Sequence, residues 1–241
     1  MQKHRFCFFA FALLLALTIR PAAAQFLWQR AIGSASRDET AEYMVPVAGG
    51  FVTAGQTGAL SVVNDNGLFL TKVNYVGDTV WTKRLFFAGV NIFYPRGLVV
   101  DAAGNLIVSA ITFPPPPAPA VNAGLLIKLR PTGDTVWTRP VRNPAGANLV
   151  SLVLGNDGSY VVTGRVGILP VLHKFSPAGA LLWTQVVPYD NTRLGYLQNL
   201  VAVPNGYFLV SSPNVGNIKS KYITVNEQGV YQTEHIGSIS D

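Results

Sequence analysis

Leu126–Thr138, LIKLRPTGDTVWT, is the stretch that decides the fold. Strand-forming residues flank the tetrapeptide Arg130-Pro131-Thr132-Gly133, which has Pro and Gly where a type I turn favours them. The pattern predicts a β-hairpin. It recurs three times, as Leu70–Thr82 (LTKVNYVGDTVWT), Leu172–Thr184 (LHKFSPAGALLWT) and the more divergent Tyr222–Thr233 (YITVNEQGVYQT).

The turn glycine sets the register of these copies. Its four positions are Gly77, Gly133, Gly179 and Gly229, spaced 56, 46 and 50 residues apart. Five residues earlier stand Lys72, Lys128, Lys174 and Thr224, and four residues later stand Trp81, Trp137, Trp183 and Thr233. Glycine suits this position because it accepts a positive φ without steric cost. We interpret these lysine, glycine and tryptophan positions as structural repeat positions.

A second glycine series lies upstream of the first, and apolar runs flank each member. Its members are Gly50, Gly104, Gly158 and Gly206. The two series together predict four short antiparallel strands per repeat, which is the content of a β-propeller blade. We therefore expect an all-β, propeller-like array with about four blades, at 40–85, 92–141, 147–187 and 195–236.

Residues 1–24 have the three parts of an export signal. Lys3 and Arg5 form a basic start, Phe6–Ile19 is apolar, and Ala22–Ala24 provides small residues for cleavage. The alternative, a membrane anchor, is less favoured because the apolar run is short for a span. We expect cleavage after Ala24, no membrane span in the mature chain, and a secreted or cell-surface location, with the periplasm as an alternative.

The mature domain, 25–241, begins and ends with the same part of the repeat, the part that is expected to form the outer strand. Gln25–Arg37 (QFLWQRAIGSASR) matches Gly229–Ser240 through a shared Ile-Gly-Ser. An additional outer strand is thus expected before the first blade. This favours an incomplete ring, a fragment of a longer protein, or self-association that closes the ring.

Composition excludes several functional classes. Cys7 is the single cysteine and lies in the signal, so a disulfide or thiolate metal site is not expected. Removing Lys3, Arg5 and Arg20 leaves 15 basic residues against 12 acidic ones, a net charge of +3. The basic residues are scattered, which argues against a nucleic-acid partner.

The run Thr132–Trp137 resembles the tryptophan-docking repeat of quinoprotein-type (PQQ-like) propellers, and of secreted bacterial propeller-repeat proteins. The resemblance implies that Trp81, Trp137 and Trp183, and less closely Trp28, pack between adjacent blades. Quinoprotein dehydrogenases also carry a vicinal cysteine pair, a calcium site, a catalytic aspartate and more blades. The mature chain lacks cysteine and has too few repeats, so we predict no such activity and no cofactor.

We predict no catalytic, cofactor-binding or metal-ligating residue from the motifs. His173 and His235 are too far apart in sequence to suggest a zinc site, and His173 is interpreted as a packing residue. Asn64–Gly67 lacks the glutamate that closes a calcium loop, so it is read as a turn. Asp38 and Glu39 are expected at the surface.

The three lysines Lys72, Lys128 and Lys174 have two interpretations. They could form a ring of cations around a channel. We favour long stems that cover apolar surface while the ammonium groups remain in water, because the recurrence follows the repeat itself.

Function is expected in the segments that do not repeat. Phe113–Ala120 (FPPPPAPA) is interpreted as a polyproline spacer, with a docking site as the alternative. The loops at 86–94 and 188–193 are the other candidates. The favoured function is an exported, non-catalytic module that presents loops to a protein or glycan. The alternative is a secreted hydrolase or lyase that acts on polysaccharide with carboxylates from different blades.

Overall fold

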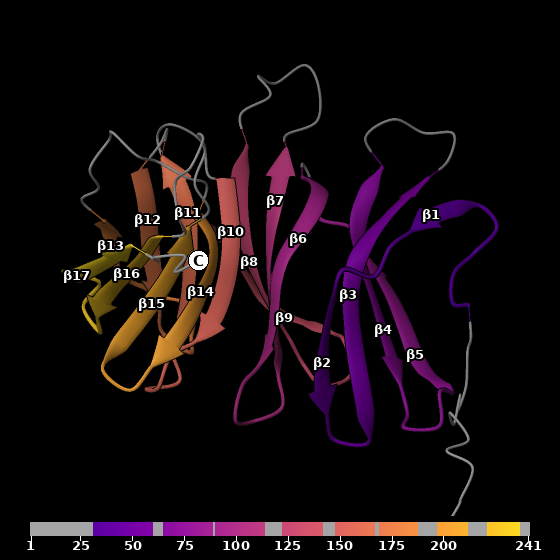
Figure 1. The fold of residues 1–241 in the computed structure, drawn as a ribbon. Helices are drawn as coiled ribbons and strands as arrows, with labels where there is room; N and C mark the ends of the chain where they lie inside the picture. Colours follow the sequence, from indigo (N-terminus) through magenta and orange to yellow (C-terminus); the bar gives the residue numbers. More distant parts are fainter. Residues whose placement is uncertain are drawn as a thin grey trace, which may run out of the picture. The chain divides into compact units, whose positions relative to one another are not determined.

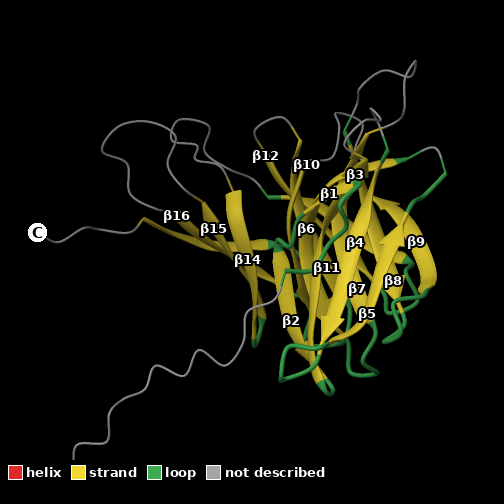
Figure 2. Ribbon diagram, turned by 90° about the vertical axis from the view of Figure 1, so that its right-hand side faces the viewer, coloured by secondary structure: helices red, strands yellow, loops and turns green. Residues whose placement is uncertain are grey.

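The computed structural model describes residues 31–59, 65–88, 90–113, 122–141, 148–166, 169–187, 197–211 and 221–236. Residues Ile32–Asp241 form one compact unit. The described part of this unit contains strands, turns and loops but no helix (Figure 2). The predicted all-β class is therefore confirmed.

The described residues form seventeen strands, which are arranged in four antiparallel sheets (Figure 1). The first sheet contains β1 (Arg37–Glu39), β2 (Tyr43–Val47), β3 (Gly50–Ala59), β4 (Asn66–Val73) and β5 (Thr79–Leu85). The second contains β6 (Asn91–Val100), β7 (Leu106–Phe113), β8 (Ala123–Leu129) and β9 (Thr135–Val141). The third contains β10 (Asn148–Leu154), β11 (Tyr160–Val166), β12 (Leu169–Phe175) and β13 (Leu181–Val186). The fourth contains β14 (Leu197–Val203), β15 (Gly206–Ser211), β16 (Lys221–Asn226) and β17 (Tyr231–Ile236).

Each of the last three sheets is a meander, in which every strand pairs with its neighbours in sequence. The first sheet differs because β1 and β2 both pair with β3, one with each half of that strand. They act together as a single broken inner strand. The additional strand expected over Gln25–Arg37 falls mostly outside the described residues, as does all of the signal segment.

The quoted stretch forms the hairpin of β8 and β9. The Gly133 amide donates to the Arg130 carbonyl at 2.8 Å, and Gly133 has a φ of 82°. The pairing register shifts between Lys128 and Leu129, as expected for a type I turn followed by a left-handed residue. Gly77, Gly179 and Gly229 have equivalent turns, with φ between 75° and 88°.

Apolar side chains fill the three spaces between successive sheets. Leu70 and Ile127 belong to the cluster between the first and second sheets, and Ile107 and Tyr160 to the cluster between the second and third. Leu172 and Leu209 belong to the cluster between the third and fourth sheets. Each side chain of this size contributes about 1.5–3 kcal/mol when fully buried. A sheet with two apolar faces therefore gains its stability from its neighbours.

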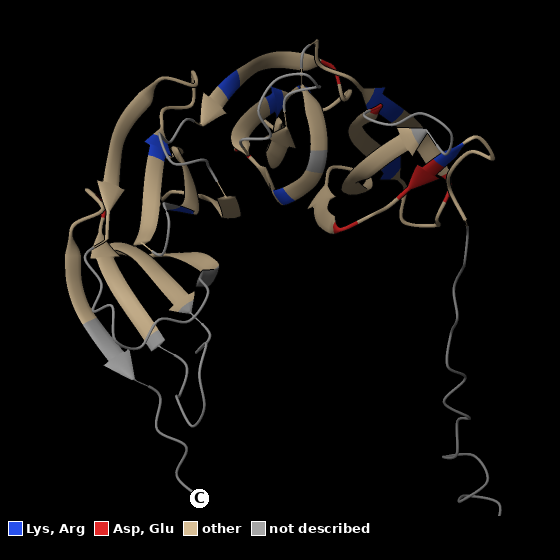
Figure 3. Ribbon diagram, turned by 90° about the horizontal axis from the view of Figure 1, so that it is seen from above, with Lys and Arg blue, Asp and Glu red and all other residues tan. Residues whose placement is uncertain are grey.

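The sheets follow one another in chain order (Figure 1), and Figure 3 shows the same array from above. Neighbouring sheets meet mainly through their first strands, with β2 beside β6, β6 beside β10, and β10 beside β14. Among the described strands, the first and fourth sheets share no extensive contact. The array is thus an incomplete propeller, and we call its sheets blades 1 to 4.

Candidate functional site

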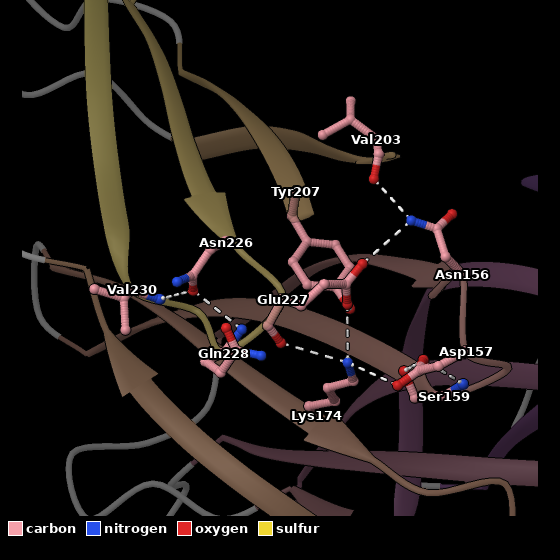
Figure 4. Close-up of polar contacts among 10 residues, drawn as sticks. All are labelled: Asn156, Asp157, Ser159, Lys174, Val203, Tyr207, Asn226, Glu227, Gln228 and Val230. Atoms are coloured by element: carbon pink, nitrogen blue, oxygen red, sulfur yellow. Dashed lines mark hydrogen bonds and ion pairs between the residues drawn. The ribbon is translucent and has the colours of Figure 1, made fainter. Parts of the chain in front are cut away.

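The candidate site is a group of charged side chains at the junction of blades 3 and 4 (Figure 4). Its centre is Lys174, on the buried strand β12, whose side chain is only 6% exposed. A buried ammonium is costly unless it is paired. Lys174 can occupy this position because carboxylates reach it from two directions.

One carboxylate comes from the same blade and one from the next. Lys174 Nζ lies 2.9 Å from Asp157 Oδ2, in the β10–β11 turn, and 3.0 Å from Glu227 Oε2, in the β16–β17 turn. The hydroxyl of Tyr207, on β15, donates to the same Glu227 oxygen at 3.0 Å. Two blades therefore contribute to one hydrogen-bonded network.

A second link holds the turn of blade 3 on blade 4. Asn156 Nδ2 donates to the Val203 carbonyl at 2.8 Å and to Glu227 Oε1 at 3.2 Å. Both oxygens of Glu227 are consequently bound. The carboxylate is 28% exposed, so its remaining surface is open to solvent.

The electrostatics keep the two carboxylates and the ammonium of the network charged. Burial alone would raise the pKa of Asp157, but hydrogen bonds from Ser159 and Lys174 outweigh it and lower the pKa to about 2. Burial opposes the charge of Glu227 as well, and Lys174 and Tyr207 again lower its pKa. Burial would lower the pKa of Lys174, whereas its carboxylate partners raise it. At neutral pH, the network contains two carboxylates and one ammonium.

A sister network lies at the junction of blades 2 and 3, around Lys128. Its Nζ lies 2.9 Å from Asp101 Oδ2 and 2.9 Å from the hydroxyl of Tyr160, and it donates to the Pro177 carbonyl at 3.2 Å. Burial opposes the charge of Asp101, but bonds from Lys128 and Asn105 lower its pKa to about 2. The Tyr160 hydroxyl also donates to Asp101 Oδ2 at 3.2 Å.

These two networks correct the interpretation of the repeated lysines. We predicted ammonium groups in water, but the side chains of Lys128 and Lys174 are 12% and 6% exposed and are ion-paired. The reason is that the following blade covers each ammonium and supplies a tyrosine hydroxyl. Lys72, the third lysine, is half-buried and has no carboxylate partner among the described residues.

The structure places each repeated tryptophan beside the turn glycine of the following blade. A Cβ built on Gly133 would stand 3.2 Å from the Trp81 ring, one on Gly179 would stand 3.0 Å from Trp137, and one on Gly229 would stand 2.8 Å from Trp183. The glycine thus provides both a positive φ and room for an indole. Gly77 occupies the corresponding turn of blade 1 with a φ of 88°.

Blade 1 has another ion-paired group, which corrects one more prediction. Glu39 was expected at the surface, but its side chain is 3% exposed, pairs with Arg84 and accepts a hydrogen bond from Thr57. Arg37 donates to Asp65 at 2.9 Å. Asp38 is exposed, as expected. Successive side chains of a strand point to opposite faces of the sheet. Because β1 pairs with β3, Glu39 therefore lies on the buried face of the sheet, whereas Asp38 faces solvent.

His173 is buried, with 4% exposure, and its Nδ1 lies 2.9 Å from the Thr184 hydroxyl. Burial lowers its pKa.

The described residues contain no group of three or more potential metal ligands. None of the described segments forms a helix long and apolar enough to span a membrane. The proline run at 114–120 and the loop at 188–193 lie outside the described residues.

Sequence reasoning missed the residues that complete the networks. Asp101 and Asp157 belong to turns of the second glycine series, and Tyr160 and Tyr207 follow glycines of that series within two residues. An acid in the turn together with a following tyrosine occurs only in blade 3, so the sequence offers no periodic signal for these partners. The turns of blades 1 and 4, Val47–Gly50 and Val203–Gly206, have no acid, and blade 2 has Leu106 in place of tyrosine.

No known protein family matches this sequence, and no curated protein matches it. Solved structures do share the fold. A GH43 β-1,3-galactosidase matches with a TM-score of 0.53 and 10% identity over 81% of this chain and 44% of its own. An exo-β-1,3-galactanase from Phanerochaete chrysosporium matches with a TM-score of 0.48 and 11% identity over 86% and 50%. A proposed gluconolactonase matches with a TM-score of 0.46 and 14% identity over 90% and 86%.

The four antiparallel sheets and the galactosidase match together establish the propeller-type fold. The chain spans about half the length of the galactosidase and galactanase structures that it matches. The first of these neighbours is an enzyme by name and not a binding module. The comparison thus contradicts our choice of a non-catalytic module.

Proposed function

We propose that this chain is the propeller part of an exported enzyme that cleaves polysaccharide, as a hydrolase or a lyase. Two findings support the proposal. The GH43 β-1,3-galactosidase has the same type of fold over 81% of the chain. Acids from different blades also meet in one place, which is the arrangement that such an enzyme requires.

The observation that carries the proposal is the approach of Asp157 to Glu227. Both carboxylates bind the same ammonium, at 2.9 and 3.0 Å, so the two bound oxygens lie no more than about 6 Å apart. Carboxyl groups about 5–5.5 Å apart serve as nucleophile and acid in retaining glycosidases. The side chain of Asp157 is 53% exposed, so a sugar could reach it from solvent.

The charges of the pair limit the roles it can have. Because Lys174 keeps both carboxylates ionised, they suit the roles of nucleophile or base. They do not suit the role of proton donor, which requires a protonated acid at neutral pH. The donor in our proposal is therefore a different group. In a lyase reaction, the leaving glycosidic oxygen takes up the proton that this donor provides.

The test is turnover of a panel of polysaccharides by the purified chain, with β-1,3-galactan, xylan, arabinan and pectate included. New reducing ends report hydrolysis, and the ultraviolet absorbance of an unsaturated uronate reports elimination. We expect Asp157→Asn or Glu227→Gln to reduce the turnover rate about 100-fold or more, the range for a lost acid or base. Asp134→Asn, at an exposed acid that pairs with Lys83, is the control and should retain activity.

The outcomes separate the class of function from the residues assigned to it. If the wild-type chain turns over none of these polymers, the proposed function fails. Turnover that survives both Asp157→Asn and Glu227→Gln would remove the pair from the mechanism and leave the enzyme class standing.

Export and ring closure belong to the same proposal. The basic and apolar start of the chain supports export, with a mature protein that begins at Gln25. The PQQ-like character of the repeat supports a larger ring, completed by further blades or by a second copy. N-terminal sequencing of the exported protein tests the first statement, and light scattering of the purified protein tests the second.

A further inference from the structure

Among the described residues, the lysine on the third strand has a carboxylate partner at the other two junctions but none at the junction of blades 1 and 2. Lys128 and Lys174 each have a carboxylate from a turn of their own blade and a tyrosine hydroxyl from the next blade. Lys72 holds the same strand position as Lys128 and Lys174, because all three have the same cross-strand neighbours. On one side each is paired with a tryptophan. On the other side each is paired with a β-branched residue, in the order Val52, Ile107 and Val161.

Two partners of the lysine, the carboxylate and the phenol, are missing at this first junction. The turn of blade 1, Val47–Gly50, is shorter than the turn that holds Asp101 and contains no acid. Leu106 takes the place of Tyr160 and Tyr207, so there is no hydroxyl. The ammonium of Lys72 therefore has neither a counter-ion nor a phenol among the described residues.

A cavity occupies the vacated space. Its volume is about 180 Å³, and its walls include Lys72, Ala48, Leu106 and Pro131. Apart from Lys72, the side chains that line it are apolar. Pro131 is the repeat equivalent of Pro177, whose carbonyl accepts from Lys128. The cavity thus lies where the sister junctions hold their carboxylate and phenol.

We propose that this cavity binds a small organic carboxylate with an apolar body about the size of a benzene ring. The ligand's carboxylate pairs with Lys72 in the role that Asp101 has for Lys128. Its apolar body fills the space that a tyrosine ring occupies at the other two junctions. The site is independent of the Asp157–Glu227 pair and of the proposed enzymatic function.

Size and charge define this class of ligand. An apolar cavity of about 150 Å³ accommodates benzene, so the observed volume suits a six-carbon ring or a branched aliphatic acid. The single ammonium of Lys72 balances the single negative charge of a carboxylate ligand. A phosphate or sulfate dianion would place a second charge among apolar walls without a partner, which is unfavourable.

The test is calorimetric titration of the purified full chain with sodium benzoate, with acetate and phosphate as comparison anions. We expect benzoate to bind more tightly than either, because acetate lacks the apolar body and phosphate exceeds the charge. Lys72→Met should weaken benzoate binding about tenfold or more, as expected for loss of a charge-assisted bond. Leu106→Tyr should do the same by filling the cavity with the ring that the sister junctions have.

Lys83→Met is the matched control, because Lys83 lies near the same junction but pairs with Asp134 outside the cavity. It should leave the benzoate affinity unchanged. Saturation-transfer NMR on the wild-type chain gives a readout without any variant, and hexanoate should displace the benzoate signal.

Several results would overturn the inference: no benzoate binding to the wild type, equal affinity for phosphate, or unchanged affinity in Lys72→Met. Unchanged affinity in Leu106→Tyr would also refute the cavity as the site. Polysaccharide turnover is not measured in any of these experiments, so their failure leaves the proposed function unaffected.

Discussion

The indole of Trp137 on β9 lies against Gly179, in the β12–β13 turn of the following blade. A Cβ at Gly179 would stand 3.0 Å from the indole Cε2. The same turn requires a φ of 83° at Gly179. Glycine is therefore needed twice at one position, once for the backbone of its own blade and once for the side chain of the blade before it.

Two glycine substitutions should separate these requirements. Gly158→Ala replaces a turn glycine with a φ of 78° and nothing within 4 Å of the new Cβ, so it should cost only the left-handed strain, about 1 kcal/mol. Gly179→Ala should cost about 1 kcal/mol more, because the indole must also shift. Urea unfolding of both variants measures the difference in the free energy of unfolding. Equal losses would mean that Trp137 does not depend on this contact.

The lysines should differ in what they contribute to stability. Lys174→Met leaves Asp157 and Glu227 facing each other without a cation, and should cost about 2 kcal/mol of unfolding free energy, with the value reduced by the exposure of Asp157. Lys72→Met removes no ion pair among the described residues and should change stability by less than about 0.5 kcal/mol. Denaturant titration compares the two variants. A large loss from Lys72→Met would contradict the absence of a structural partner there.

Acid should weaken the junction of blades 2 and 3. The pKa of Asp101 is about 2 in the folded protein against an ordinary 3.8, so its stabilisation is present above pH 3.8 and is lost as the pH falls towards 2. This shift corresponds to about 2 kcal/mol. Asp101→Asn should lose that amount at neutral pH and show a flatter pH dependence below 3.8. A curve parallel to that of the wild type would show that Asp101 does not contribute.

His173 should produce a pH dependence nearer neutrality. Burial lowers its pKa from the ordinary 6.5, so protonation favours the unfolded chain. The stabilisation is present above pH 6.5 and is lost as the pH falls below it. His173→Ile, which introduces the residue that blade 2 has at Ile127, should remove this dependence between pH 7 and 5. Thermal unfolding at several pH values tests it, and a dependence that persists in the variant would assign it to other groups.

Local pattern was enough to predict much of this fold. The tetrapeptide Arg130–Gly133 specifies its own turn, because the preferences of Pro and Gly act within four residues. The repeat then predicted four-stranded sheets, since each copy carries the same turns between apolar runs. The interpretation of His173 as a packing residue needed no more than its place in a strand.

The candidate site could not be predicted in the same way. Lys174 and Glu227 lie 53 residues apart and in different blades, so no local preference relates them. The same repeat position holds a paired ammonium at Lys128 and, at Lys72, one without a carboxylate partner among the described residues. Glu39 was misjudged for a similar reason, because its burial depends on pairing of β1 with β3.

The sequence by itself determined the hairpins, their period and the glycine in each turn, because these follow from backbone sterics and short-range apolar pattern. Only the tertiary structure decided which lysines are neutralised and which one faces a cavity. That outcome depends on the side chains that a turn of the same blade and the neighbouring blade bring to each ammonium. Lys72 differs from Lys128 and Lys174 because it has neither a carboxylate nor a phenol partner among the described residues.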